Sequence, residues 1–395
     1  MQLGTIEGDV DTSGFEFRAT EEVGKFDFVS VKSNDRWILA QIESVTKQSS
    51  GETTAHANII GYRDKGMTRA PRQVIEPGSI VYSVDQDLIS QTLGLDNDGL
   101  RIGSLETNDG IDIFVNPEDF YKHFAVLAQT GAGKSYLTGV LVEEMLEQDF
   151  PVLVVDPHGE FSSLEDPNPD NKDASRSYDI KEYSPNTDIN KSALPLEFSS
   201  VNLGKKQIQT LITDSLTNSQ MGVLYNALKG LKEKDEDYSL TDVEDAVEKE
   251  ESSAKWNLLN YLEQLEDSGL FSESPVDPRD LVEEGRASVI NLKAVEPDNA
   301  EMAVYLLAKN LFDLRKRDEI PPFIMVFEEA HNFIPEKGFG QAISNPIMRK
   351  IASEGRKFGV GIGVISQRPA RIDKNVLSQC NTQFILKVTN PNDLN

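Results

Sequence analysis

Two different patterns of hydrophobic and polar positions follow one another along the chain. From residue 1 to about residue 95, short runs of alternating apolar and polar residues recur with turn residues between them. Such alternation is typical of half-buried β-strands. The runs cover residues 15–18, 26–31, 37–42, 57–62 and 80–84. Short strands at this spacing predict a small β-barrel over residues 1–95.

From residue 96 to residue 395, continuous apolar runs alternate with longer helical patterns, which is typical of an α/β fold with a mostly parallel sheet. We predict strands over residues 123–128, 152–156, 288–292, 323–328, 360–366 and 383–388. Between the second and third of these lies a helical insertion, 197–275. Its stretch 233–251 holds ten acidic and two basic residues, and we interpret it as a solvated helical face or an exposed loop.

The composition of the chain excludes some classes of function. The chain has 66 acidic and 39 basic residues and a net charge of −27, which argues against an exterior that binds nucleic acid or anionic membrane throughout. A local basic site, such as a channel lining, is still compatible with that charge. The single cysteine, Cys380, favours a reducing compartment. No signal peptide and no apolar run of the ~18 residues of a membrane span is visible, so we expect a cytoplasmic protein without membrane contact.

The strongest chemical signal is residues 128–135, AQTGAGKS, which follow an apolar run and open a helical pattern. This is the strand–loop–helix context of a nucleotide-binding P-loop. Lys134 would contact the β and γ phosphates of ATP, and the Ser135 hydroxyl would bind Mg²⁺. Ala128 replaces the first glycine of the usual pattern, and we expect the loop to tolerate it. The predicted phosphate cradle comprises Gln129, Thr130, Gly131, Ala132, Gly133, Lys134 and Ser135.

Carboxylates follow two of the predicted strands. Glu328 and Glu329 come directly after the apolar run 323–327, at the strand end where α/β sheets bind ligands. We predict that Glu328, standing where aspartate is more usual, organises Mg²⁺ and that Glu329 polarises the attacking water. Asp156 ends the strand 152–156 and could lie beside the γ-phosphate; the alternative is a turn-forming residue. We interpret His331, like His158, as a structural hydrogen-bonding residue.

A polar and basic segment surrounds the strand 360–366. Gln367 follows that strand, where its amide could report whether the γ-phosphate is present. Arg356 has two functional interpretations: an arginine finger on the nucleotide of a neighbouring subunit, or part of a channel that contacts DNA phosphates. The segment's basic residues are Arg349, Lys350, Arg356, Lys357, Arg368, Arg371 and Lys374, and its acids are Glu354 and Asp373.

Taken together, these motifs resemble the HerA family of hexameric DNA-translocating ATPases, which are HerA/FtsK-like P-loop NTPases. The resemblance runs from residue 1 to Asn395 and implies an N-terminal barrel followed by a RecA-like domain. It also implies a homo-hexameric ring with ATP between subunits, in which Arg356 is donated by the next subunit. The motifs that carry it are QTGAGKS (129–135), VVDPHGEF (154–161), FEEAHNF (327–333), EGRKFG (354–359), SQRP (366–369) and the stretches 377–384 and 390–393.

The resemblance further implies partners. Double-stranded DNA would pass through a central channel, and the motor would work with a NurA-like nuclease in DNA-end resection, or with a sirtuin-type or other effector in anti-phage defence. Lys122 stands where the family often has an arginine ahead of the P-loop strand. The family also continues beyond the position of Asn395, so we expect the ATPase domain to continue there.

Two other functions compete with a ring motor. A superfamily 2 helicase has similar first motifs, but 194 residues separate Lys134 from Glu328, and only one RecA-like core is visible. A nucleotide-gated scaffold, which assembles and activates an effector without productive translocation, needs the same ATP site. Stimulation of ATP hydrolysis by duplex DNA would distinguish the motor from the scaffold.

Overall fold

The computed structural model describes residues 1–95, 98–165, 178–212 and 216–387. Its contacts divide the chain into two compact units, Met1–Asn116 and Pro117–Asn395. The sequence pattern changes at residue 95, and the contacts place residues 98–116 in the first unit. No helix in these described ranges is both long enough and apolar enough to cross a membrane.

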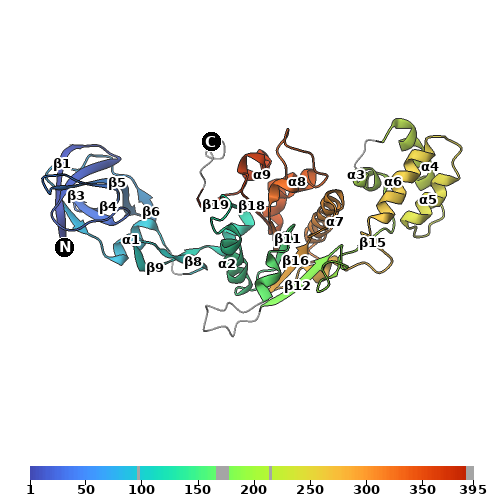
Figure 1. Ribbon diagram of the computed structural model, residues 1–395, viewed down its shortest axis with the longest axis horizontal. Coiled ribbons are helices and arrows are strands. Elements are labelled where there is room, and N and C mark those ends of the chain that lie inside the picture. The colour runs from blue at the N-terminus through green and yellow to red at the C-terminus, as the bar shows by residue number, and fades with distance from the viewer. Residues whose placement is uncertain (96–97, 166–177, 213–215, 388–395) are drawn as a thin grey trace. The chain divides into compact units, whose positions relative to one another are not determined.

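The first unit is built on a closed antiparallel barrel, drawn in blue in Figure 1. Six strands pair in the order β2-β1-β7-β3-β4-β5, and β2 pairs with β5 to close the ring. Phe15 and Phe17 on β2 point into the centre with Val29 and Val31 on β3, and all four are buried. The predicted barrel is therefore confirmed. Its strands, with the short β6, are β1 (Gln2–Val10), β2 (Gly14–Ala19), β3 (Phe28–Ser33), β4 (Arg36–Lys47), β5 (Thr53–Asp64), β6 (Met67–Arg69) and β7 (Ile80–Ser83).

A short helix and a hairpin follow the barrel. Helix α1 (Gln86–Leu93) begins at Asp85, whose carboxylate accepts a hydrogen bond from the Leu88 N–H, and it ends at Gly94 in the left-handed region. Strands β8 (Leu100–Leu105) and β9 (Asn108–Val115) then form an antiparallel hairpin. None of these three elements is predicted by the hydrophobic pattern of the sequence.

The second unit contains an eight-stranded sheet with the order β13-β12-β16-β11-β17-β18-β10-β19, in which every paired strand is parallel. All six predicted strands are present, and β12 and β13 extend one edge. Every residue of β10, β11, β17 and β18 is buried, which explains why these strands have continuous apolar sequences. The strands are β10 (Phe124–Leu127), β11 (Val152–Asp156), β12 (Asp179–Ser184), β13 (Leu194–Pro195), β16 (Arg286–Asn291), β17 (Phe323–Phe327), β18 (Val360–Ser366) and β19 (Thr382–Ile385).

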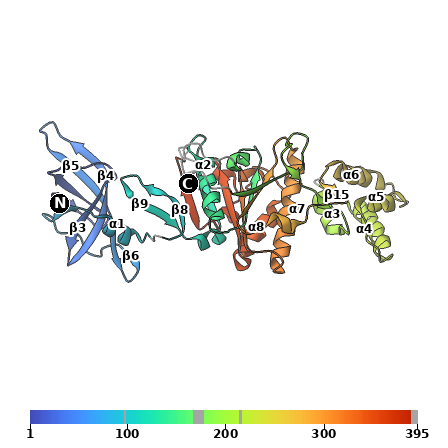
Figure 2. The ribbon, with the colours of Figure 1, turned by 90° about the horizontal axis from the view of Figure 1, so that it is seen from below.

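Helices cover this sheet, as Figures 1 and 2 show. Helix α2 (Lys134–Leu146) packs on β10, β11 and β16, so it runs from the P-loop strand across to β11. Helix α8 (Asn345–Glu354) packs on β18 and on α7 (Pro297–Lys316), and the short α9 (Lys374–Leu377) packs on α8.

The predicted insertion is mostly helical, and its buried apolar residues belong to the same core cluster as those of the sheet. Leu258, Leu262 and Leu265 on α6 are buried, as their helical spacing predicted. Within the acidic stretch 233–251, every acid except Glu244 and Glu250 is exposed, in agreement with a solvated face. The elements are β14 (Phe198–Ser199), α3 (Lys205–Leu211), α4 (Asn218–Lys232), α5 (Leu240–Glu248), α6 (Lys255–Asp267) and β15 (Phe271–Ser272).

Candidate functional site

The sheet topology brings three loops to one edge. Strand β18 lies between β10 and β17, with Leu127 opposite Ser366 and Phe327 opposite Val364. Because the strands are parallel, the loops that follow β10, β17 and β18 leave the sheet on the same side, where α/β proteins bind ligands. The first of these loops is the P-loop, the second contains Glu328 and Glu329, and the third contains Gln367.

The loop after β10 has the backbone that a P-loop requires. Gly131 and Gly133 have φ values of +76° and +89°, a conformation that favours glycine, and a Cβ at either would project into open space. The Ala128 N–H donates to the Ser366 carbonyl at 3.3 Å, and the Gln129 N–H donates to the Lys387 carbonyl at 2.9 Å. Ala128 is accommodated in the buried turn, and helix α2 begins directly at Lys134.

Lys134 points at the acids that follow β17. Its ammonium forms an ion pair with Glu328 Oε1 and lies 3.5 Å from Glu329 Oε1. The Glu328 side chain is 1% exposed, and its second oxygen, Oε2, has no hydrogen-bond partner among the described residues. A buried acceptor without a donor costs about 1–3 kcal/mol, so this oxygen is suited to a hydrated cation or a proton donor.

Glu329 is held in an unusual conformation. Its backbone lies in the left-handed region, with φ +46° and ψ +48°, a strained state for a residue with a side chain. Its Oε2 lies 3.2 Å from His331 Nδ1, and the same nitrogen lies 3.2 Å from Ser366 Oγ. Burial alone would raise the pKa of Glu329, but His331 and the Lys134 ammonium together lower it below its ordinary value. The carboxylate is therefore ionised at neutral pH.

Gln367 and Asp156 contact protein groups at this edge. The Thr130 hydroxyl donates to Gln367 Oε1, which connects the end of β18 with the P-loop. Asp156 is fully buried, and its carboxylate accepts hydrogen bonds from the N–H groups of His158 at 3.1 Å, Gly159 at 2.9 Å and Phe161 at 2.9 Å. These contacts are those of a turn-forming residue. A direct role for Asp156 at the γ-phosphate stays a prediction.

The oxygen ligands present fit a magnesium nucleotide. The Ser135 hydroxyl lies in the first turn of α2 and donates to Glu160 Oε2 at 2.6 Å. Glu328 Oε2, a carboxylate oxygen at the same edge of the sheet, is the other candidate ligand. Hydroxyl and carboxylate oxygens are the ligands that Mg²⁺ prefers. Ser135 and Glu328 are the metal ligands that the sequence motifs predict, and Glu160 is not among the predicted site residues.

Arg356 lies away from its own P-loop. It belongs to the 3-10 turn Gly355–Phe358, before the amino end of β18, whereas the P-loop follows the carboxyl end of β10. The seven residues of β18 span about 20 Å, so Arg356 sits at the opposite edge of the sheet. Its side chain is exposed and forms no ion pair or hydrogen bond with any described residue. Among the other basic residues nearby, Arg349 pairs with the buried Asp373.

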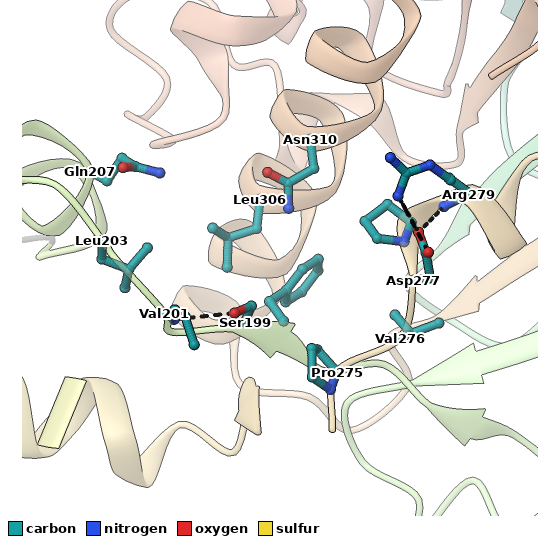
Figure 3. Close-up of a pocket in the computed structure, with 12 residues that line it drawn as sticks. Ser199, Val201, Leu203, Gln207, Pro275, Val276, Asp277, Arg279, Leu306 and Asn310 are labelled. Atoms are coloured by element: carbon teal, nitrogen blue, oxygen red, sulfur yellow. Dashed lines mark hydrogen bonds and ion pairs between the residues drawn. The ribbon is translucent and has the colours of Figure 1, made fainter. Parts of the chain in front are cut away.

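A separate pocket of about 500 Å³ lies where the insertion joins the sheet domain (Figure 3). Leu306 and Asn310 of α7 face Val201 and Leu203 across it, and Asp277 pairs with Arg279 at its rim. None of its lining residues belongs to the P-loop or to the acids after β17. The pocket therefore lies outside the site described above.

The chain resembles known proteins along most of its length. Residues 100–311 match the family model described as the central domain of helicase HerA. The chain is 29% identical to the DNA double-strand break repair helicase HerA of Pyrococcus furiosus, over 92% of this chain and 74% of that protein. It is 28% identical to the probable DNA double-strand break repair helicase HerA of Methanocaldococcus jannaschii, over 100% of this chain and 87% of that protein.

Among solved structures, VirB4 of Thermoanaerobacter pseudethanolicus has the same fold, with a TM-score of 0.53 at 17% identity over 76% of this chain and 86% of that one. This likeness confirms the predicted P-loop NTPase fold. The family match covers more than half of the chain and includes the P-loop, β11 and β16. The chain therefore belongs to the HerA family of helicases.

Proposed function

We propose that this chain is the ATP-hydrolysing subunit of a homo-hexameric ring motor that translocates double-stranded DNA through its central channel. The observation that carries the proposal is the meeting of Lys134, Glu328 and Glu329 at the edge where Gln367 contacts the P-loop. The names of its relatives support a role in DNA double-strand break repair. A cytoplasmic motor of this kind would work with a partner nuclease or effector, in DNA-end resection or in anti-phage defence.

Each residue has a proposed role in hydrolysis. Lys134 would leave the carboxylates to contact the β and γ phosphates, and the backbone N–H groups of 129–135 would surround those phosphates. Glu329 would polarise the attacking water, because it is ionised and already oriented by His331. Gln367 would detect loss of the γ-phosphate through Thr130. Bound Mg²⁺, held through Ser135 and Glu328, would neutralise charge on the phosphates.

A nucleotide-gated scaffold that assembles an effector without translocation is the alternative, because it needs the same site. The test is steady-state ATP hydrolysis with and without duplex DNA. A motor's rate should rise severalfold when DNA is added, and translocation should appear as displacement of a protein block from the duplex. A rate that DNA leaves unchanged would favour the scaffold over the motor.

Replacing Glu329 by glutamine is expected to slow hydrolysis about 10²-fold or more while ATP still binds, because an amide cannot polarise water as a carboxylate does. Binding is measured with a fluorescent ATP analogue, and hydrolysis by phosphate release. Glu328→Gln is the comparison variant. It should raise the Mg²⁺ concentration that hydrolysis requires more than it lowers the rate of hydrolysis at saturating Mg²⁺. If Glu328→Gln is the slower enzyme with intact binding, the two roles are reversed.

A further inference from the structure

The turn after β11 holds residue 160 in a fixed place. The buried Asp156 carboxylate accepts hydrogen bonds from the N–H groups of Gly159 and Phe161, the two neighbours of Glu160 in sequence. The Phe161 side chain is itself buried, and Gly159 has a φ of +73°. The backbone of Glu160 is therefore anchored on both sides, although its side chain is exposed.

Helix α2 brings the P-loop serine to this turn. Because α2 packs on both β10 and β11, its first turn passes beside the loop that leaves β11. The Ser135 hydroxyl donates to Glu160 Oε2 at 2.6 Å, although 25 positions separate the two residues. This length falls in the range of charge-assisted O–H···O⁻ bonds, which are about twice as strong as neutral ones.

The direction of this hydrogen bond matters for metal binding. A serine hydroxyl has one hydrogen and two lone pairs. When the hydrogen points at Glu160, the lone pairs of Ser135 Oγ remain available to a cation. A hydroxyl without such an acceptor can rotate, so its orientation must be fixed when the cation binds.

We infer that Glu160 is a positioning residue for the Mg²⁺ of the nucleotide site, a deduction that rests on the proposed function. It fixes the Ser135 hydroxyl so that its oxygen faces the metal. Partners of this kind change metal affinity by about 10- to 100-fold when they are removed. Asp156 contributes indirectly, because its carboxylate builds the turn that presents Glu160.

The test is a Mg²⁺ titration of nucleotide binding, followed by the fluorescence of an N-methylanthraniloyl-ATP probe at fixed concentration. Glu160→Ala is expected to raise the Mg²⁺ concentration for half-maximal binding about tenfold. In EDTA the same variant should bind the probe as well as the wild type or better, because a negative charge near the phosphates has been removed. Thermal unfolding checks that the variant is folded.

A double-mutant cycle separates positioning from simple charge. In a Ser135→Ala background, Glu160→Ala should cause no further change in the Mg²⁺ midpoint, because no hydroxyl remains to be positioned. Glu273→Ala, which removes an exposed acid from the insertion, is the matched control and should behave as the wild type.

Two outcomes would overturn this inference and leave the proposed function intact. The first is a wild-type Mg²⁺ midpoint in Glu160→Ala. The second is a shift of the midpoint in the double variant that equals the sum of the shifts in Ser135→Ala and Glu160→Ala. A different result would overturn the proposed function as well. In that case the wild-type protein itself would bind the probe without any dependence on Mg²⁺, or would not bind it at all.

Discussion

Replacing Lys134 by alanine is expected to lower ATP hydrolysis by about 10³-fold or more, to the limit of detection. The Lys134 ammonium pairs with Glu328 and lies 3.5 Å from Glu329, at the start of the helix that follows the P-loop. Without it, charge that develops on the γ-phosphate loses its nearest positive partner. Phosphate release measured at saturating ATP and Mg²⁺ tests this expectation.

The same substitution removes the cation from a buried acidic pair. We expect the fold to survive, because one of the two carboxylates can take up a proton in place of the lost ion pair. Lys134→Arg is the matched control: it keeps the charge and should keep the unfolding temperature. Its planar guanidinium cannot reproduce the compact ammonium, so hydrolysis should still fall. Wild-type turnover in folded Lys134→Ala would refute the P-loop assignment.

The central sheet could be predicted from sequence because its strands are buried on both faces. Continuous apolar runs such as 323–327 and 360–366 give a strong signal, and both became strands at the predicted positions. Strand β12 gave no such signal, since Asp179, Lys181 and Glu182 interrupt it and only its last two residues are buried. The predicted strand 383–388 was confirmed up to Ile385, and its last residue lies outside the described ranges, as does the family-like stretch 390–393.

The sequence motifs predicted that Lys134, Glu328 and Glu329 lie at one edge, and the structure brings them together, but their roles stay predictions and some of the contacts there were not predicted. The P-loop and the pair Glu328–Glu329 are contiguous motifs, so their spacing in sequence was sufficient. The contact of Glu160 with Ser135 depends on the path of α2 from β10 to β11, which sequence periodicity does not encode. For the same reason, the alternation of apolar and polar residues could not show that the Asp156 carboxylate accepts hydrogen bonds from three N–H groups of the turn that follows it.

The number of charged residues along the sequence does not show which of them contact one another in the fold. The segment 349–374 has an excess of basic residues, but Arg349 is tied to Asp373, and Arg371 lies over the ring of Phe339, with its guanidinium 5.5 Å from the centroid. Arg356 and Lys357 are adjacent and both exposed. These two neighbouring cations, a guanidinium and an ammonium, carry the same charge, so the function of one can be tested against the other.

Arg356→Ala is expected to lower ATP hydrolysis about 10³-fold, as loss of an arginine finger does. The side chain lies about 20 Å from its own P-loop by the length of β18, so it cannot reach the nucleotide bound by its own subunit. An adjacent subunit of a ring would bring this edge against a neighbour's site. Lys357→Ala changes the charge equally at the next position and should keep nearly full hydrolysis.

Mixing subunits shows whether the arginine acts between chains. Lys134→Ala and Arg356→Ala proteins should each be inactive alone. In mixed rings, some interfaces join an intact P-loop from an Arg356→Ala subunit with an intact finger from a Lys134→Ala subunit, so partial hydrolysis should return. Native mass spectrometry confirms that the rings are mixed, and absence of recovery in such rings would count against a finger in trans. If Arg356→Ala instead hydrolyses ATP normally but loses duplex DNA binding, Arg356 belongs to the channel lining, because only the DNA phosphates would then have lost their partner.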